Sequence, residues 1–158
     1  MMTGIDGKAW RAWLAVMLCV AAIWMLSGES FSAASTSRFL TPFLRWLDPD
    51  ISWRAIVRAH FFVRKAAHVT EYAILAMLAF RALRLSLDVS TPRVIGLAMG
   101  LVVAVAALDE LRQSFLATRT GSLADVAINL AGGALGVALI VCFHRWLGIG
   151  APATAEDP

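Results

Sequence analysis

Apolar runs alternate with short polar segments along the chain, and four of these runs are candidates for membrane spans. A helix that crosses a bilayer needs about 20 predominantly apolar residues. The runs cover approximately residues 10–26, 66–85, 94–108 and 123–147. The sequence shows no alternating β pattern and no internal repeat. The pattern therefore predicts an all-α integral membrane bundle of about four transmembrane helices.

The first run is short for a full crossing, and it follows a short head that carries Lys8 and Arg11. A basic head, an apolar stretch and the small residues after it are also typical of a cleaved signal peptide. However, Trp10, Trp13 and Trp24 lie near the two ends of the run, where tryptophan commonly anchors a helix at the membrane interfaces. We expect a retained helix, with cleavage as the alternative.

The connection between the first two spans contains a second kind of helix signal. In residues 38–47, apolar side chains recur at helical spacing beside two arginines, and Asp48-Pro49 follows. This pattern predicts an interfacial amphipathic helix in the first extracytoplasmic loop. Asp50 or Ser52 can cap a further helix, which is expected to continue directly into the second span.

The composition agrees with a membrane protein. Hydrophobic residues make up 59% of the chain and charged residues 16%, whereas soluble domains contain about a quarter charged residues. Residues 1–148 are predicted to form one transmembrane domain, and 149–158 a disordered C-terminal tail. The net charge of +3 comes from basic residues around the apolar runs, which favours anionic lipid head groups over nucleic acid as partners. Cys19 and Cys142 lie inside apolar runs and are expected to be buried free thiols.

Short basic segments indicate the orientation of the chain. The N-terminal pair Lys8 and Arg11 and the compact Arg81–Arg93 connection are the types of segment that stay in the cytoplasm. The opposite side then also carries many basic residues, between 38 and 65 and at 112 and 119, so the count of charges alone does not decide the orientation. Because the two short segments have the most weight, we expect a multi-pass protein of the bacterial cytoplasmic (inner) membrane with both termini in the cytoplasm.

Polar side chains gather at the opposite end of the second, third and fourth spans. Ionisable groups are costly in hydrocarbon and persist there when they are paired, hydrated or functional. On the fourth span, Asp125 and Asn129 continue into a stripe of glycines, which allow close helix packing in lipid. The candidate binding residues are Arg64, Lys65, His68, Glu71, Tyr72, Asp109, Glu110, Gln113, Arg119, Ser122, Asp125 and Asn129.

Three motifs among these residues resemble those of the VanZ-like membrane protein family. They are Arg-Lys-x-x-His-x-x-Glu-Tyr at 64–72, Asp-Glu-x-x-Gln at 109–113, and Arg-x-x-Ser-x-x-Asp-x-x-x-Asn-x-x-Gly at 119–132. The namesake of the family is associated with low-level teicoplanin resistance, and many members have no established biochemical activity. The resemblance therefore implies a role in the cell envelope, with antibiotic resistance as one possible outcome, without supplying a reaction.

The chemistry of the cluster leaves two main hypotheses. The first is non-catalytic binding of a lipid, a lipid-linked precursor or an amphiphilic glycopeptide in an extracytoplasmic polar pocket. The alternative is a membrane enzyme that acts on a lipid-linked envelope substrate, with His68, Glu71 or Asp125 as the candidate catalytic group. A proton-coupled transporter is disfavoured by four short spans without a repeat. We expect no metal or cofactor, because His68 is the single histidine of the cluster.

Ion pairs are the structural explanation for the same charges. Arg64, Lys65, Arg112 and Arg119 could pair with the four carboxylates, and we expect two of the carboxylates to be held in this way. Asp125 in particular should be held by Arg119 or Arg64. His60 and His144 lie outside the cluster and are expected at the membrane interfaces.

Overall fold

The computed structural model describes residues 7–28, 33–116 and 122–147, and over these ranges it contains five helices and no strand. The helices are α1 (Gly7–Leu26), α2 (Ala33–Leu47), α3 (Trp53–Ser86), α4 (Thr91–Ser114) and α5 (Leu123–Trp146). Four of them, α1, α3, α4 and α5, are long and apolar enough to cross a membrane. The predicted all-α membrane bundle is therefore confirmed.

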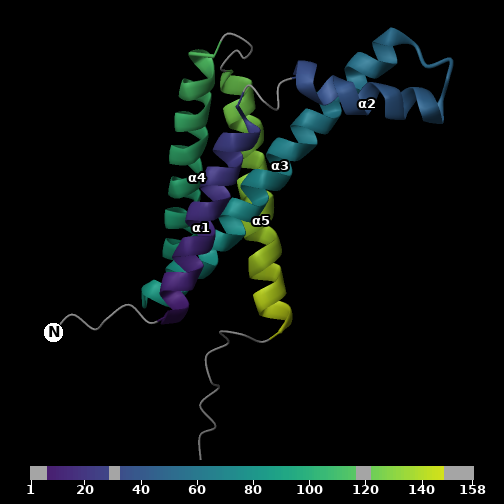
Figure 1. Cartoon of the computed structure of the whole chain (residues 1–158). Coiled ribbons are helices and arrows are strands. Elements are labelled where there is room, and N and C mark those ends of the chain that lie inside the picture. The colour runs from purple at the N-terminus through teal and green to yellow at the C-terminus, as the bar shows by residue number, and fades with distance from the viewer. Residues whose placement is uncertain (1–6, 29–32, 117–121, 148–158) are drawn as a thin grey trace, which may run out of the picture.

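The crossing helices pack side by side, as Figure 1 shows. The first residues of α1 and α4 and the last residues of α3 and α5 lie at one end of the bundle. The last residues of α1 and α4, the first residues of α5, and α2 lie toward the other end. Both described ends of the chain therefore lie on the same side, as four crossings require.

Helix α3 is too long to be only a membrane span. Its 34 residues extend over roughly 51 Å at 1.5 Å per residue, whereas the hydrocarbon core is about 30 Å thick. Its first part slants out of the bundle and packs beside α2, so that α2 and residues 53–65 form a projecting arm (Figure 1). Ser52 caps α3, and its hydroxyl oxygen accepts a hydrogen bond from the Ala55 N–H at 3.3 Å. The predicted continuous helix is confirmed.

Two helix boundaries differ from the predicted ones. Helix α2 begins at Ala33 rather than at residue 38, although it ends at Leu47 before Asp48-Pro49 as expected. Helix α4 continues to Ser114 instead of ending near residue 108. The polar residues Asp109, Glu110 and Gln113 are therefore part of a helix and are buried. Asp109 and Glu110 accept hydrogen bonds from residues outside α4, so these polar side chains are accommodated within the helix.

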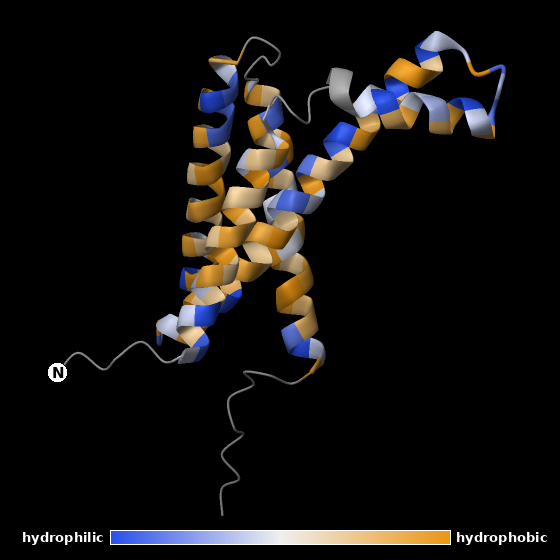
Figure 2. Ribbon diagram, viewed as in Figure 1, coloured by the Kyte–Doolittle hydropathy of each residue, from blue (hydrophilic) through white to orange (hydrophobic). Residues whose placement is uncertain are grey.

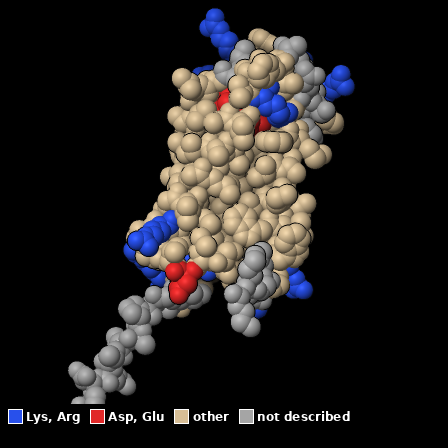
Figure 3. Space-filling model, turned by 90° about the vertical axis from the view of Figure 1, so that its left-hand side faces the viewer, with Lys and Arg blue, Asp and Glu red and all other residues tan. Residues whose placement is uncertain are grey.

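The outside of the bundle is apolar between its two ends. Hydrophobic residues dominate the middle of the crossing helices, and hydrophilic residues gather at the ends and on the arm (Figure 2). The charged side chains visible in Figure 3 likewise lie at the two ends, with an uncharged band between them. Cys142 is exposed on α5, so its predicted burial is wrong, and Cys19 is partly buried. The reason is that Cys142 lies on the outer surface of α5, which no other described helix covers.

Helix α1 packs on the bundle along one stripe, which includes Ala12, Val16 and Ile23. Trp13 donates a hydrogen bond from its indole Nε1 to the Ser86 hydroxyl at 2.9 Å, which joins α1 to the last turn of α3. Small and branched side chains at this spacing form a close helix contact. Helix α1 is therefore an integral part of the bundle in this structure.

The closest helix contact lies between α3 and α5. A Cβ atom added at Gly132 would lie 2.9 Å from the Val69 Cα, and one added at Gly136 would lie 2.8 Å from the Ala73 Cα. At Gly133 it would lie 2.8 Å from a Val102 methyl group of α4. Real Cβ atoms do not approach backbone this closely, so the glycine stripe allows α5 to lie directly on α3.

We predict that Gly136→Ala lowers the free energy of unfolding by about 1–3 kcal/mol, because the added methyl group must push α5 away from the α3 backbone. Gly100→Ala on α4 is the matched control, since nothing lies within 4 Å of its added Cβ. There the change should be neutral or slightly stabilising, because alanine favours a helix over glycine. Thermal unfolding in detergent measures both. Equal melting temperatures for the two variants would contradict the packing.

Candidate functional site

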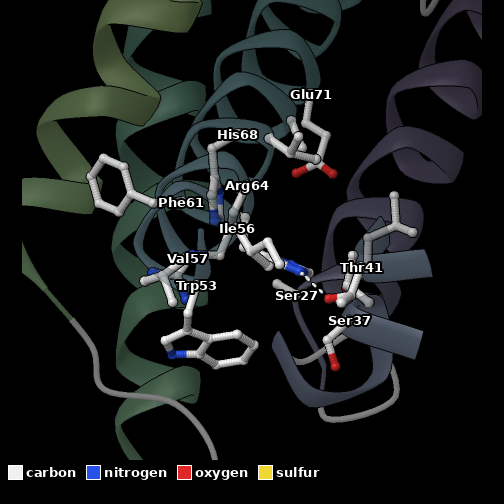
Figure 4. Close-up of a pocket in the computed structure, with 15 residues that line it drawn as sticks. Ser27, Ser37, Thr41, Trp53, Ile56, Val57, Phe61, Arg64, His68 and Glu71 are labelled. Carbon is white, nitrogen blue, oxygen red and sulfur yellow. Dashed lines mark hydrogen bonds between the residues drawn. The ribbon is translucent and has the colours of Figure 1, made fainter. Parts of the chain in front are cut away.

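A cavity of about 500 Å³ lies between the end of α1, the helix α2 and the first half of α3. Hydroxyl groups line it from Ser27 and from Ser37 and Thr41 of α2. Aromatic and aliphatic side chains, among them Trp53 and Phe61, line another part (Figure 4). The volume is within the range of small-ligand pockets, about 300–1,000 Å³. The mixed lining suits a molecule that is part polar and part apolar.

One face of α3 supplies most of the cavity wall. Its lining positions recur every three or four residues, which is the spacing of one helical face. Trp53, Val57 and Phe61 make the part on the arm, whereas Arg64, His68 and Glu71 make the part nearer the bundle. The wall therefore changes from apolar to polar along a single helix.

The arm closes one side of the cavity through a polar contact. Thr41 Oγ1 of α2 lies 3.1 Å from His60 Nε2 of α3, the contact that is dashed in Figure 4. A hydroxyl and an imidazole can each donate or accept, so this pair forms a hydrogen bond with either tautomer. His60 therefore lies in the cavity wall as well as in the arm, where the sequence predicted only a position at the membrane interface.

Arg64 is the cation of the cavity. Its side chain is exposed, and among the residues that the structure describes it has neither an ion-pair nor a hydrogen-bond partner. His68 is buried in the same wall, with 5% of its surface exposed. Because its planar guanidinium group is exposed beside apolar side chains, Arg64 can donate paired hydrogen bonds to an anion that enters the cavity.

Lys65 forms an ion pair with Asp125 between α3 and α5. Their side chains are only 16% and 14% exposed. The predicted arginine partner is therefore wrong for Arg64, and Arg119 lies outside the described residues. The reason is geometric: consecutive helix residues point about 100° apart, so Lys65 faces α5 while Arg64 faces the cavity.

Asp109 is the centre of a buried hydrogen-bond network between α1 and α4. It accepts hydrogen bonds from the Ser27 hydroxyl at 2.6 Å, from Gln113 Nε2 at 2.7 Å and from Arg112 at 3.1 Å. Arg112 also donates to the Trp24 carbonyl at 2.9 Å. Because Asp109 has no exposed surface, these donors replace the water it loses on folding. The network holds the end of α1, and with it Ser27, beside the cavity.

The remaining candidates lie where α3, α4 and α5 pack. Glu110 accepts a hydrogen bond from the Ser122 backbone N–H at 2.9 Å, and Ser122 caps α5 by accepting from the Ala124 N–H at 3.2 Å. Tyr72 and Asn129 are fully buried. A carboxylate at a helix N-terminus is favourable, because it meets the positive end of the helix dipole.

The structure thus divides the predicted cluster into two parts at the same end of the bundle. Arg64, His68 and Glu71 line the cavity. The other residues lie between packed helices, where they are buried or paired: Lys65, Tyr72, Asp109, Glu110, Gln113, Ser122, Asp125 and Asn129. Among the described residues, no group of three His, Cys, Asp or Glu side chains could hold a metal ion.

The sequence reasoning missed several lining residues, of which His60, Thr41 and Ser27 are the most polar. The sequence spacing does indicate that His60 belongs with the other polar residues of α3. It lies one helical turn before Arg64, which lies one turn before His68, so all three share a face. No comparable signal exists for Ser27 or Thr41, because other helices bring them to the cavity.

The fold and the polar end of the bundle define a multi-pass membrane protein. A family model described as VanZ/LLP1 matches residues 12–144, which is most of the chain. The chain therefore belongs to the VanZ/LLP1 family, as the three motifs suggested. No curated protein and no solved structure matches it.

We predict that Asp109→Asn lowers the free energy of unfolding by about 1–3 kcal/mol, because it removes the charged acceptor from a buried hydrogen-bond network, while Arg112 stays partly exposed. Asp88→Asn, at an exposed position between α3 and α4, is the control and should change stability by less than about 0.5 kcal/mol. Thermal unfolding in detergent compares the two. A loss no larger than that of the control would show that the network does not stabilise the bundle.

A double-mutant cycle tests the pair between α3 and α5. Lys65→Gln and Asp125→Asn should show a coupling energy of about 1–3 kcal/mol, as expected for residues in direct contact. The same cycle with Arg64→Gln in place of Lys65→Gln should be additive within about 0.5 kcal/mol. The assignment of the partner is wrong if the arginine cycle shows the larger coupling.

Proposed function

We propose that this protein binds a membrane amphiphile, such as a lipid, a lipid-linked envelope precursor or an amphiphilic glycopeptide, in the cavity between α1, α2 and α3. The observation that carries the proposal is the division of the cavity wall. One part is polar and contains the cation Arg64, and the other is formed by aromatic and aliphatic side chains. A molecule with a charged head and an apolar chain matches both parts.

Arg64 would hold the anionic head of the ligand. A guanidinium group can donate two parallel hydrogen bonds to a phosphate or carboxylate. The hydroxyl groups of Ser37 and Thr41 line the same cavity, so the head of the ligand would lie among further polar groups. Glu71 would favour a ligand that also carries a hydroxyl or amino group. Lys65 is not part of this proposal, because it is already paired with Asp125.

The apolar chain of the ligand would leave along the arm. Trp53, Val57 and Phe61 line the cavity and are still 66%, 50% and 49% exposed. They therefore join the cavity wall to the apolar outer surface of the arm. An acyl or prenyl chain could pass from the cavity into the bilayer without crossing a polar surface, which avoids the cost of hydrating it.

The cavity would face away from the cytoplasm of the bacterial inner membrane. The opposite end of the bundle carries Lys8 and Arg11 at the start of α1 and Arg81, Arg84 and Arg93 around the short connection from α3 to α4. Short basic segments of this kind remain in the cytoplasm. Both termini would then be cytoplasmic, and the arm would lie in the outer interface, where an envelope precursor or an antibiotic is met.

A catalytic role is the second candidate, and the position of His68 favours it. The imidazole is buried in the cavity wall, and Glu71 lies one turn further along the same helix. His68 could act as a general base on a lipid-linked substrate, with Arg64 stabilising negative charge that develops in the reaction.

The binding proposal predicts that Arg64→Gln loses the ligand while the protein still folds. Native mass spectrometry of protein purified from its own membrane measures the lipid that remains bound. The retained fraction should fall by about tenfold, because one charge-assisted contact is lost. Arg93→Gln, at the other end of the bundle, removes the same charge and should retain the ligand. Equal retention by both variants would contradict the proposal.

The same preparation separates binding from catalysis. Purified protein is incubated with extracted envelope lipids, and the lipids are compared by mass spectrometry with those from a His68→Ala variant. A new lipid species that only the unchanged protein forms would establish the enzyme. Lipid bound to both proteins, with no product, would leave binding as the function.

A further inference from the structure

We infer that the arm carries a second anion site, formed by Arg54 and Arg58 of α3, which binds the phosphate of an anionic phospholipid head group. The two arginines, together with Trp53 and Val57, line a separate hollow on the arm. Trp53 and Val57 also belong to the wall of the main cavity. The site is thus the outer neighbour of that cavity, and it does not depend on what the cavity holds.

Arg54 and Arg58 are four residues apart on α3 and line the same hollow. Residues four apart on a helix lie on the same face, with Cβ atoms about 5–6 Å apart. Two arginines at this spacing can direct their planar N–H donors at a single tetrahedral anion. Within the described part of the chain, neither Arg54 nor Arg58 has an ion-pair or hydrogen-bond partner.

Without an anion, this end of α3 is electrostatically unfavourable. Like charges four residues apart repel each other on a helix. Cations near a helix N-terminus also oppose the helix dipole, and α3 begins at Trp53 with no acidic residue in its first turn. A bound phosphate would relieve both effects, because its negative charge would lie between the two arginines and near the positive end of the helix dipole.

The surroundings of the site identify the anion as a lipid rather than free phosphate. Large apolar side chains are exposed on the same arm, among them Trp46 at 76%, Trp53 at 66% and Phe62 at 66%. Tryptophan and phenylalanine beside arginine are typical of segments that lie at the head-group level of a membrane. At that depth the abundant anions are phospholipid phosphates, so the site meets them at high local concentration.

Thermal unfolding in nanodiscs tests the site. The double variant Arg54→Gln with Arg58→Gln is compared with unchanged protein in discs of phosphatidylcholine alone and in discs that also contain phosphatidylglycerol. Phosphatidylglycerol should raise the melting temperature of the unchanged protein more than that of the variant, in which Arg64 can still bind an anionic head. In phosphatidylcholine alone, where the choline group offsets the phosphate charge, the double substitution should change the melting temperature less than in the mixed discs. An equal or larger effect in phosphatidylcholine alone would overturn the inference.

A matched control on the same arm removes the same charge elsewhere. Arg38→Gln with Arg45→Gln changes two exposed arginines of α2 that line neither cavity. Native mass spectrometry of protein released from the mixed discs should show about tenfold less bound phosphatidylglycerol for the α3 variant and little change for the α2 variant. Equal loss in both would mean that the arm attracts lipid only through its summed charge, which overturns the site.

Inorganic phosphate distinguishes the two sources of the anion. Added in millimolar excess to phosphatidylcholine discs, it should stabilise the unchanged protein far less than phosphatidylglycerol does. Equal stabilisation would make the site one for a soluble anion and would overturn its assignment to a lipid.

Discussion

The contact of α5 on the backbone of α3 is the constraint on which the rest of the structure depends. Without a hydrophobic driving force between helices in lipid, close van der Waals contact must hold the bundle together. Gly132 and Gly136 allow that contact because they place no atoms between the two helix backbones. The same contact brings Lys65 opposite Asp125, so that a cation and a carboxylate near the membrane pair across the two helices.

The length of α3 explains why the cavity lies at the edge of the bundle. One part of the helix is a span that α5 covers, and the other continues outward beside α2. Since a single helix forms both parts, its cavity face passes from lipid-facing aromatic residues to polar residues near the bundle. Under the proposed function, the cavity would lie at the head-group level of the membrane and would bind a charged head and an apolar chain together.

Two buried carboxylates of α4 connect this helix to the end of α1 and to the start of α5. Asp109 fixes the end of α1 through the Ser27 hydroxyl, and Glu110 fixes the start of α5 through the Ser122 N–H. Both oxygens of Asp109 accept hydrogen bonds, which replace the water that the carboxylate loses on folding. Glu110 accepts one through Oε2, while its Oε1 is buried without a hydrogen-bond partner among the described residues. Arg64 differs from the paired cation Lys65, although the two are adjacent in sequence, because it faces the cavity rather than another helix.

The sequence by itself determined the helices, the membrane class, the family and the end of the bundle where polar residues gather. These properties are local: apolar runs set the spans, Ser52 and Ser122 begin helices, and the glycine stripe marks a close contact. Only the tertiary structure decided which polar residues line a cavity and which are structural. That choice depends on the rotation of each helix about its axis and on which neighbour it meets. Helix packing determines which side of α3 faces α2 and which faces α5. His60 therefore lines the cavity, whereas Lys65 pairs with Asp125.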